Sequence, residues 1–200
     1  MTSETLTQNW HFEQLFDALD EHGFAIIDDA YPDAFFSAVR KECLSHLQEF
    51  REAAIQTGVV SKIRSDHILW IEDHLTQASQ HTQALLDLGQ QFNRAFFSNI
   101  KEIEAHFACY DAGEFYALHR DNPQQKNNRI LSSVYYLHDQ WQADWGGQLR
   151  LQDKHAQWHI IEPKPNRIAL FQSDLLHEVL PAQHQRLSIT AWLRSQRDIW

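Results

Sequence analysis

Four polar side chains near expected strand ends have the types that bind a metal and an anionic co-substrate: His119, Asp121, His177 and Arg186. Two imidazoles and one carboxylate form the facial ligand set of non-haem Fe(II) oxygenases, which leaves the other metal positions open. A 2-oxo acid and dioxygen can fill those positions. Arg186 offers a permanently charged fork for the distal carboxylate of the acid. The sequence therefore predicts an iron site with a 2-oxo acid co-substrate.

A single His-x-Asp tripeptide is weak evidence for this site. The chain has 13 His, and such a tripeptide occurs by chance, while a lone His is more often a surface or packing residue. The strands expected around these residues are stronger evidence for a metal site. On a strand, His119 and Asp121 would share one face. His177 follows an apolar run at 168–171, and Arg186 begins another at 187–192. Ligands at strand ends fit a metal in the mouth of an antiparallel barrel. The remaining imidazoles that we considered fit no ligand spacing: His106, His138, His155, His159 and His184.

Apolar residues at helical spacing dominate the first hundred residues. They predict a helix over 10–22 ended by Gly23, a strand over 24–27, a helix that begins at 32 or 33, and a long helix from a cap at Thr76 to about 99. We expect these helices to form a structural layer without chemistry. The long helix should turn its apolar side chains inward: Leu85, Leu86, Leu88, Phe92, Phe96 and Phe97.

The segment 53–75 is less regular. Candidate strands at 58–60 and 68–71 surround a polar turn, Arg64-Ser65-Asp66. The stretch 61–73 could be a mobile flap over the active site, since loops near a site often carry substrate contacts. A plain hairpin explains the same pattern, and the residues alone slightly favour it.

Beyond residue 100 the period becomes strand-like, with turns rich in Gly, Pro, Asn and Asp. We expect an α+β fold with a double-stranded β-helix (jelly-roll) core of about eight strands and N-terminal helices packed on one sheet. A single domain would cover 1–200, with helical support at about 9–100 and the catalytic jelly roll at about 102–194. The candidate strands are 102–110, 114–119, 129–138, 147–152, 157–162, 166–171, 175–180 and 186–194.

The composition argues against several classes of function. The net charge of −10 argues against binding to nucleic-acid phosphates. No apolar run approaches the ~20 residues that span a bilayer, and no targeting segment is visible at the start, so we expect a cytoplasmic protein without a membrane partner. The cysteines, Cys43 and Cys109, give neither a disulfide framework nor zinc-finger spacing.

An ordered series of motifs extends the argument. The series resembles the 2-oxoglutarate- and Fe(II)-dependent prolyl hydroxylases, and most of all the hypoxia-inducible-factor prolyl hydroxylases and their bacterial counterparts. The resemblance runs over about 60–194 and includes 63–66 and 70–72, which are similar to the substrate-covering loop of that subgroup. The motifs are 108–110, 119–123, 134–137, Trp141, 146–150, 161–163, 171–174, 177–179 and 186–192.

The resemblance implies roles for single residues. His119, Asp121 and His177 would hold Fe(II), and Arg186 with the Tyr136 hydroxyl would bind the distal carboxylate of 2-oxoglutarate. A carboxylate at 121 implies hydroxylation, because halogenating relatives have Gly or Ala there.

The other predicted roles compete with a purely structural explanation. Tyr110 would line the co-substrate pocket, and Leu149 and Trp192 would form apolar walls, although core packing explains these last two equally well. The candidates for substrate contact, Arg129, Tyr116 and Arg64, could equally be solvent-facing charge or loop packing.

The activity that the resemblance implies is peptidyl-prolyl 4-hydroxylation of a protein, with release of succinate and carbon dioxide. Its cofactors would be Fe(II), 2-oxoglutarate and ascorbate, and the translation machinery is one candidate partner. We keep two other possibilities open. One is hydroxylation of a small molecule such as a free amino acid, and the other is a non-catalytic sensor that binds metal and 2-oxoglutarate.

Overall fold

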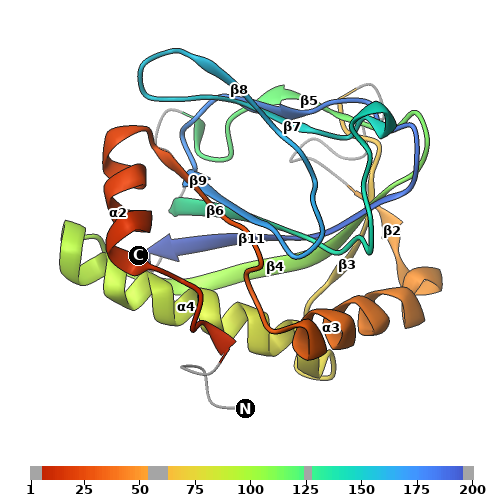
Figure 1. The fold of residues 1–200 in the computed structure, drawn as a ribbon, viewed down its shortest axis with the longest axis horizontal. Helices are drawn as coiled ribbons and strands as arrows, with labels where there is room; N and C mark the ends of the chain where they lie inside the picture. Colours follow the sequence, from red (N-terminus) through yellow and green to blue (C-terminus); the bar gives the residue numbers. More distant parts are fainter. Residues whose placement is uncertain (1–5, 54–62, 124–127, 196–200) are drawn as a thin grey trace, which may run out of the picture.

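Two antiparallel sheets lie face to face, and helices cover the outer side of the larger one (Figure 1). The computed structural model describes residues 6–53, 63–123 and 128–195. The larger sheet has the order β1-β9-β6-β11-β4-β3-β2 and the smaller one β5-β10-β7-β8. The α+β jelly-roll expectation is confirmed. The strands are β1 Phe24–Ile27, β2 Arg51–Glu52, β3 His67–Trp70, β4 Ile100–Tyr110, β5 Tyr116–His119, β6 Arg129–Tyr136, β7 Leu149–Gln152, β8 Trp158–Ile161, β9 Ile168–Gln172, β10 His177–Val179 and β11 Arg186–Ser195.

The eight strands predicted beyond residue 100 all form, with ends that move by one or two residues. The helices also follow the pattern, as α2 Phe12–Glu21, α3 Asp33–Ser45 and α4 Thr76–Phe96. Gly23 follows α2 with a φ of +84°, and its amide donates to the Leu19 carbonyl. A left-handed residue after the last turn is the usual helix stop, so this predicted end is confirmed.

The predicted cap of α4 is wrong. Thr76 is the first helical residue, and neither it nor Leu75 before it caps the helix through its side chain. The Glu42 carboxylate, from α3, accepts hydrogen bonds from the amides of Gln77 and Ala78 at 3.1 and 2.8 Å. A carboxylate at this end satisfies orphan amides and suits the helix dipole. The cap therefore comes from a neighbouring helix, which no local pattern could reveal.

The other end of α4 also differs from expectation. Phe97 is 94% exposed, so its predicted inward position is wrong. It has a φ of +52°, and this left-handed conformation directly after the helix turns its side chain away from the face that Leu85, Leu88 and Phe92 bury. The chain then enters β4, which α4 covers.

Two apolar layers fill the molecule because the central strands alternate. On β11, Leu187, Ile189, Ala191 and Leu193 join the main core beneath the helices, together with Tyr135 of β6. Val134 and Tyr136 of β6 instead join a second core with Leu149, Leu151 and Phe171, between the two sheets. Side chains that follow each other on a strand point to opposite faces. The even-numbered residues of β11 therefore face the space between the sheets.

The segment before α4 contains β3, which pairs with β2 as a hairpin and with β4 along the larger sheet. The predicted strand 58–60 and part of the proposed flap lie outside the described residues. Arg64 forms an isolated β-bridge with Tyr116, so the 63–66 turn lies against β5.

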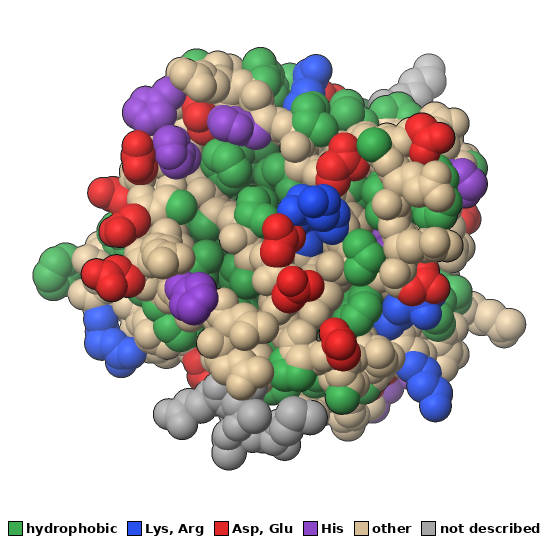
Figure 2. Space-filling model, in the orientation of Figure 1, with side chains coloured by type: hydrophobic (Ala, Val, Ile, Leu, Met, Phe, Trp, Pro, Cys, Tyr) green, Lys and Arg blue, Asp and Glu red, His purple; other side chains and the backbone are tan. Residues whose placement is uncertain are grey.

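The surface bears no dominant charged patch on the face shown in Figure 2, where acidic side chains are spread among apolar and uncharged ones. Among the described helices, none is long and apolar enough to cross a membrane.

Candidate metal centre and co-substrate pocket

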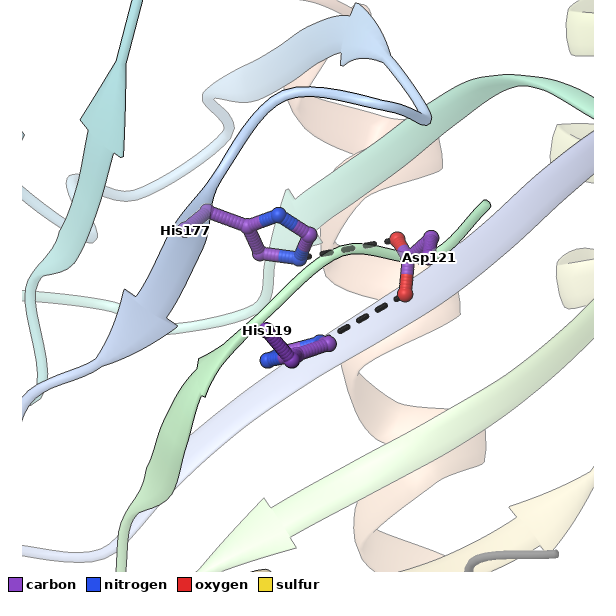
Figure 3. Close-up of side chains that lie close together, drawn as sticks. All are labelled: His119, Asp121 and His177. Atoms are coloured by element: carbon purple, nitrogen blue, oxygen red, sulfur yellow. Dashed lines mark ion pairs between the residues drawn. The ribbon is translucent and has the colours of Figure 1, made fainter. Parts of the chain in front are cut away.

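The smaller sheet brings the three predicted metal ligands together (Figure 3). His119 ends β5, His177 begins β10, and the two are direct partners in the strand pairing. Asp121 lies two residues beyond β5, so a bend and not strand alternation places its carboxylate. His119 Nε2 is 3.5 Å from Asp121 Oδ1, and His177 Nε2 is 3.6 Å from Asp121 Oδ2. One donor atom from each residue lies within 4.8 Å of the others, as a shared metal requires.

Backbone carbonyls fix which nitrogen of each imidazole can bind a metal. The Nδ1 atoms of His119 and His177 lie 2.8 and 2.9 Å from the carbonyls of Ala117 and Leu175. A carbonyl can only accept, so each Nδ1 carries the proton and donates it. The Nε2 atoms of both rings are then unprotonated, and their lone pairs point toward Asp121.

The charges of the site also suit a metal. Burial lowers the pKa of His177 to about 4, so this imidazole is neutral at pH 7. Burial works to raise the pKa of Asp121, but His177, His119 and the Ser132 hydroxyl outweigh it and hold that pKa well below its usual range. The Ser132 hydroxyl donates to Asp121 Oδ2 at 2.7 Å. Neutral imidazole and ionised carboxylate are the protonation states that metal binding needs.

Aromatic rings pack against the two imidazoles. Tyr116 stacks on His119 with ring centroids 3.7 Å apart, and Phe171 packs edge-on to His177 at 4.7 Å. These contacts limit rotation of the ligands, which favours a preformed site.

Arg186 lies on the central strand β11 and is 1% exposed. Its Nε donates to the Gly147 carbonyl at 2.8 Å, and its Nη1 donates to Ser188 Oγ at 3.2 Å. The guanidinium carbon lies 5.0 Å from the ring centroids of both Tyr110 and Tyr136. The side chain is thus fixed from several sides, with its charge in the interior.

Two buried polar atoms at this end have no hydrogen-bond partner among the described residues: Arg186 Nη2 and the Tyr136 hydroxyl. Buried polar groups are nearly always hydrogen-bonded in folded proteins. A cationic donor and a neutral donor side by side are what a buried ligand carboxylate would accept from. The pair therefore fits the distal carboxylate of a 2-oxo acid.

One cavity connects the two ends of the site. The triad and Arg186 line it together, and so do Tyr110, Leu149 and Trp192, the residues for which a co-substrate role stays a prediction. Tyr136 is not among the lining residues, but its ring lies 5.0 Å from the Arg186 guanidinium carbon. The full lining is Arg64, Tyr110, Tyr116, His119, Asp121, Val134, Leu149, Phe171, His177, Val179, Arg186, Thr190 and Trp192.

The candidates for substrate contact separate into two groups. Arg64 and Tyr116 line the cavity, with the Arg64 guanidinium 4.9 Å from the Tyr116 ring. Arg64 is not solvent-facing, because it is 8% exposed and forms a bidentate ion pair with Asp66 at 2.6 and 2.9 Å.

Arg129 lies outside the cavity lining. Its guanidinium stacks on the Trp192 ring at 3.6 Å, and its Nη1 is 4.0 Å from Asp121 Oδ1. It also pairs with Glu104 at 3.3 Å. Arg129 therefore borders the metal side of the pocket from behind Trp192.

Sequence reasoning gave no site role to several residues that the structure places there, among them the polar residues Ser132 and Thr190. Both sit on strands whose other members were named, and strand alternation gives the signal. Ser132 shares a face of β6 with Tyr136, and Thr190 shares a face of β11 with Arg186 and Trp192. The bidentate partner of Arg64, Asp66, had no such signal, because the turn that holds both has no regular period.

Comparisons with known proteins identify a family and similar folds. The model of the 2OG-Fe(II) oxygenase superfamily matches residues 105–194. The chain is similar to the crystal structure of a Pseudomonas putida prolyl-4-hydroxylase, with a TM-score of 0.85 and 32% identity over 92% of this chain and 99% of that one. It is also similar to a Trichoplax adhaerens prolyl hydroxylase in complex with a hypoxia-inducible-factor peptide fragment, with a TM-score of 0.86 and 29% identity over 92% and 89% of the two chains. A curated relative, Egl nine homolog 1 of Homo sapiens, is 32% identical over 90% of this chain, which spans about half of that relative's length (46%).

Proposed function

The chain belongs to the 2OG-Fe(II) oxygenase superfamily, and on that premise we propose that it hydroxylates a prolyl residue of a protein substrate. The reaction would be of the prolyl 4-hydroxylase type. It would consume 2-oxoglutarate and dioxygen and release succinate and carbon dioxide. The cofactors would be Fe(II) and 2-oxoglutarate, with ascorbate as the reductant.

The observation that carries this proposal is the division of the cavity. At one end stand three donors suited to Fe(II), and at the other stands Arg186, whose Nη2 has no partner among the described residues. The Tyr136 ring, whose hydroxyl likewise has no partner there, lies 5.0 Å from the Arg186 guanidinium carbon. A 2-oxo acid has a chelating end and a distal carboxylate. The cavity offers matching chemistry for each end.

His119, Asp121 and His177 would hold the iron. When bound, Fe(II) would supply the activation of dioxygen and the oxidation of 2-oxoglutarate and of the substrate C–H bond. The protein's own part is to hold both imidazoles as Nε2 ligands and to keep Asp121 ionised through His177, His119 and the Ser132 hydroxyl. Because Asp121 is a carboxylate, the site has no vacancy for a halide, and hydroxylation is the expected outcome.

Arg186 and Tyr136 would orient the co-substrate through its distal carboxylate. Tyr110 would line the pocket, and Leu149 and Trp192 would exclude water from it, since all three line the cavity. A dry pocket strengthens the ion pair between the carboxylate and the guanidinium. These residues bind and position, and they move no proton.

Arg64, Tyr116 and Arg129 would contact the substrate. Support comes from the position of the first two on the cavity lining and of Arg129 behind Trp192. The Trichoplax adhaerens relative is described in complex with a peptide fragment. A peptide that approaches this side would meet cationic and aromatic groups, and the translation machinery is one source of such a substrate.

The proposal is tested by turnover of 2-oxoglutarate to succinate with Fe(II) and ascorbate. Purified chain is incubated with a bacterial lysate, divided into a protein fraction and a small-molecule fraction. The Asp121→Ala variant removes a predicted ligand. Asp139→Ala is the matched control, because that carboxylate is exposed and pairs with Arg40 at 3.1 Å.

We expect the protein fraction alone to stimulate succinate formation with the wild-type chain and with Asp139→Ala, but not with Asp121→Ala. Mass spectrometry should then find a gain of one oxygen on a prolyl residue. Stimulation by the small-molecule fraction alone would instead indicate hydroxylation of a small molecule. Absence of turnover in every fraction, with iron bound, would indicate a sensor.

A further inference from the structure

A second group of potential metal ligands lies outside the site described above. It consists of His67 on β3, Asp111 directly after β4, and Glu114 in the turn before β5. One donor atom from each residue lies within 4.8 Å of the others, the same closeness that the triad shows. Asp111 and Glu114 lie in one turn between β4 and β5, and His67 comes from β3, so the tertiary fold brings the imidazole to the two carboxylates.

The cluster holds more negative charge than its surroundings neutralise. Within the described residues, the one ion pair that these side chains form joins His67 Nδ1 to Glu114 Oε1 at 3.6 Å. Asp111 Oδ1 accepts only from neutral groups there, the Gln185 amide at 3.1 Å and the Cys109 thiol at 3.9 Å. Burial raises the pKa of Glu114, although the Asp111 amide, which donates to Glu114 Oε2 at 2.7 Å, and His67 both act to lower it. Two carboxylates with one imidazole call for a cation of higher charge.

The donor types indicate which cation. Magnesium and calcium take oxygen ligands almost alone, whereas one imidazole with two carboxylates suits zinc. We propose that His67, Asp111 and Glu114 form a second metal site, separate from the triad, that binds a zinc ion.

A zinc ion here would join two segments that meet beside the first site. The 63–67 segment already contacts the β4–β5 region through backbone hydrogen bonds, from Ser65 N to the Phe115 carbonyl at 3.2 Å and from Ala117 N to the Ile63 carbonyl at 2.8 Å. His67 belongs to the first segment and Glu114 to the second. The bound ion would therefore hold the Arg64 turn against β5, which ends in His119.

The first test is the zinc stoichiometry of the full chain, measured by equilibrium dialysis at fixed free zinc with 5 mM magnesium present. We expect two zinc ions per wild-type chain and one in each of His67→Ala, Asp111→Asn and Glu114→Gln. The second affinity should fall at least about tenfold in each, since even loss of an outer partner of a metal site costs ten- to a hundredfold. Asp111 is exposed, so its substitution leaves the core intact.

The matched control is His74→Ala. His74 lies 3.9 Å from Glu72, and neither belongs to a three-ligand group in the described part of the chain. This variant should still bind two ions. A chain with the triad replaced by alanines should keep one ion, and zinc should then slow hydrogen exchange at the amides of Ser65 and Ala117.

The proposal is overturned if the wild-type chain binds one zinc ion and the triad variant none. It is also overturned if His67→Ala and Asp111→Asn bind the second ion as tightly as the wild type, because that ion would then sit elsewhere on the surface.

Discussion

Replacement of Tyr136 by Phe should weaken 2-oxoglutarate binding without weakening the fold. The Tyr136 side chain is fully buried, and its hydroxyl has no hydrogen-bond partner among the described residues. Loss of the hydroxyl therefore removes no hydrogen bond from the unliganded protein. It instead relieves the desolvation penalty of an unsatisfied group, which is about 1–3 kcal/mol. We expect the free energy of unfolding to stay constant or to rise by up to about that amount.

The ligand complex should respond in the opposite direction. In the proposed complex the hydroxyl donates to a carboxylate, and a hydrogen bond to a charged group is worth about 1.5–3 kcal/mol. At about 1.4 kcal/mol for each factor of ten, the dissociation constant for 2-oxoglutarate should rise roughly 10- to 150-fold. Opposite signs for stability and binding are the mark of a residue kept for its ligand.

Tyr135→Phe is the matched control, one residue away on the other face of β6. Its hydroxyl donates to Asn166 Oδ1 at 3.1 Å, and its ring packs in the core beneath the helices. This variant should lose about 1 kcal/mol of stability, the typical worth of an internal hydrogen bond. Its affinity for 2-oxoglutarate should remain that of the wild type.

Urea denaturation measures the first quantity, and calorimetric titration of the manganese-loaded chain with 2-oxoglutarate measures the second. The reasoning is refuted if Tyr136→Phe binds 2-oxoglutarate within twofold of the wild type. It is equally refuted if Tyr136→Phe loses as much stability as Tyr135→Phe, because the hydroxyl would then have a structural partner.

Three further predictions follow from buried charge and close packing. Arg64→Gln leaves Asp66 buried without its ion pair, so urea denaturation should show a loss of about 3–5 kcal/mol; a loss below 1 kcal/mol would mean that water reaches the carboxylate. Gly147→Ala places a Cβ 3.0 Å from Arg186 Cδ at a φ of +66°, so it should lower the free energy of unfolding by about 1–3 kcal/mol. It should also weaken 2-oxoglutarate binding in the same calorimetric titration. Unchanged affinity would show that Arg186 can shift freely. Burial lowers the pKa of His81 to about 3, so the unfolded chain protonates this imidazole more readily than the folded chain does. The stability that neutral His81 contributes is complete above about pH 6.5 and should be lost as the pH falls toward 3. The loss from this group should reach up to about 1.4 kcal/mol per pH unit. Denaturation at pH 7, 6 and 5 measures that slope, which should be smaller in His81→Gln; equal slopes would show that His81 titrates normally.

Much of the site was readable from the sequence because strand alternation is a local property. His119, His177 and Arg186 stand at strand ends, and the strands were found within two residues of their true limits. Tyr136 and Trp192 could be placed by the same period. The metal-binding role of these residues still depends on tertiary structure, since β5 and β10 are far apart in the chain and meet only in the folded sheet.

The features that escaped prediction either come from a distant element or lie where no periodic pattern holds. Glu42 caps α4 from another helix, and the donor of a cap cannot be read from the helix that it caps. Phe97 follows the apolar pattern of α4 but lies beyond the helix end, where a left-handed turn redirects it. The Arg64–Asp66 pair arises in a turn, and turns have no periodic pattern to read.

The pairing of strand β11 limits which mutations the protein can tolerate. It is a central strand, paired along its length with β4 on one side and with β6 on the other. Leu187, Ile189, Ala191 and Leu193 build the core, while Arg186, Thr190 and Trp192, which alternate with them, line the cavity. A one-residue slip would exchange these two sets, so that Arg186 would enter the apolar layer while Leu187 faced the pocket. Single-codon insertions and deletions between residues 186 and 195 should therefore abolish the protein, whereas apolar exchanges at positions such as Ile189 should often survive.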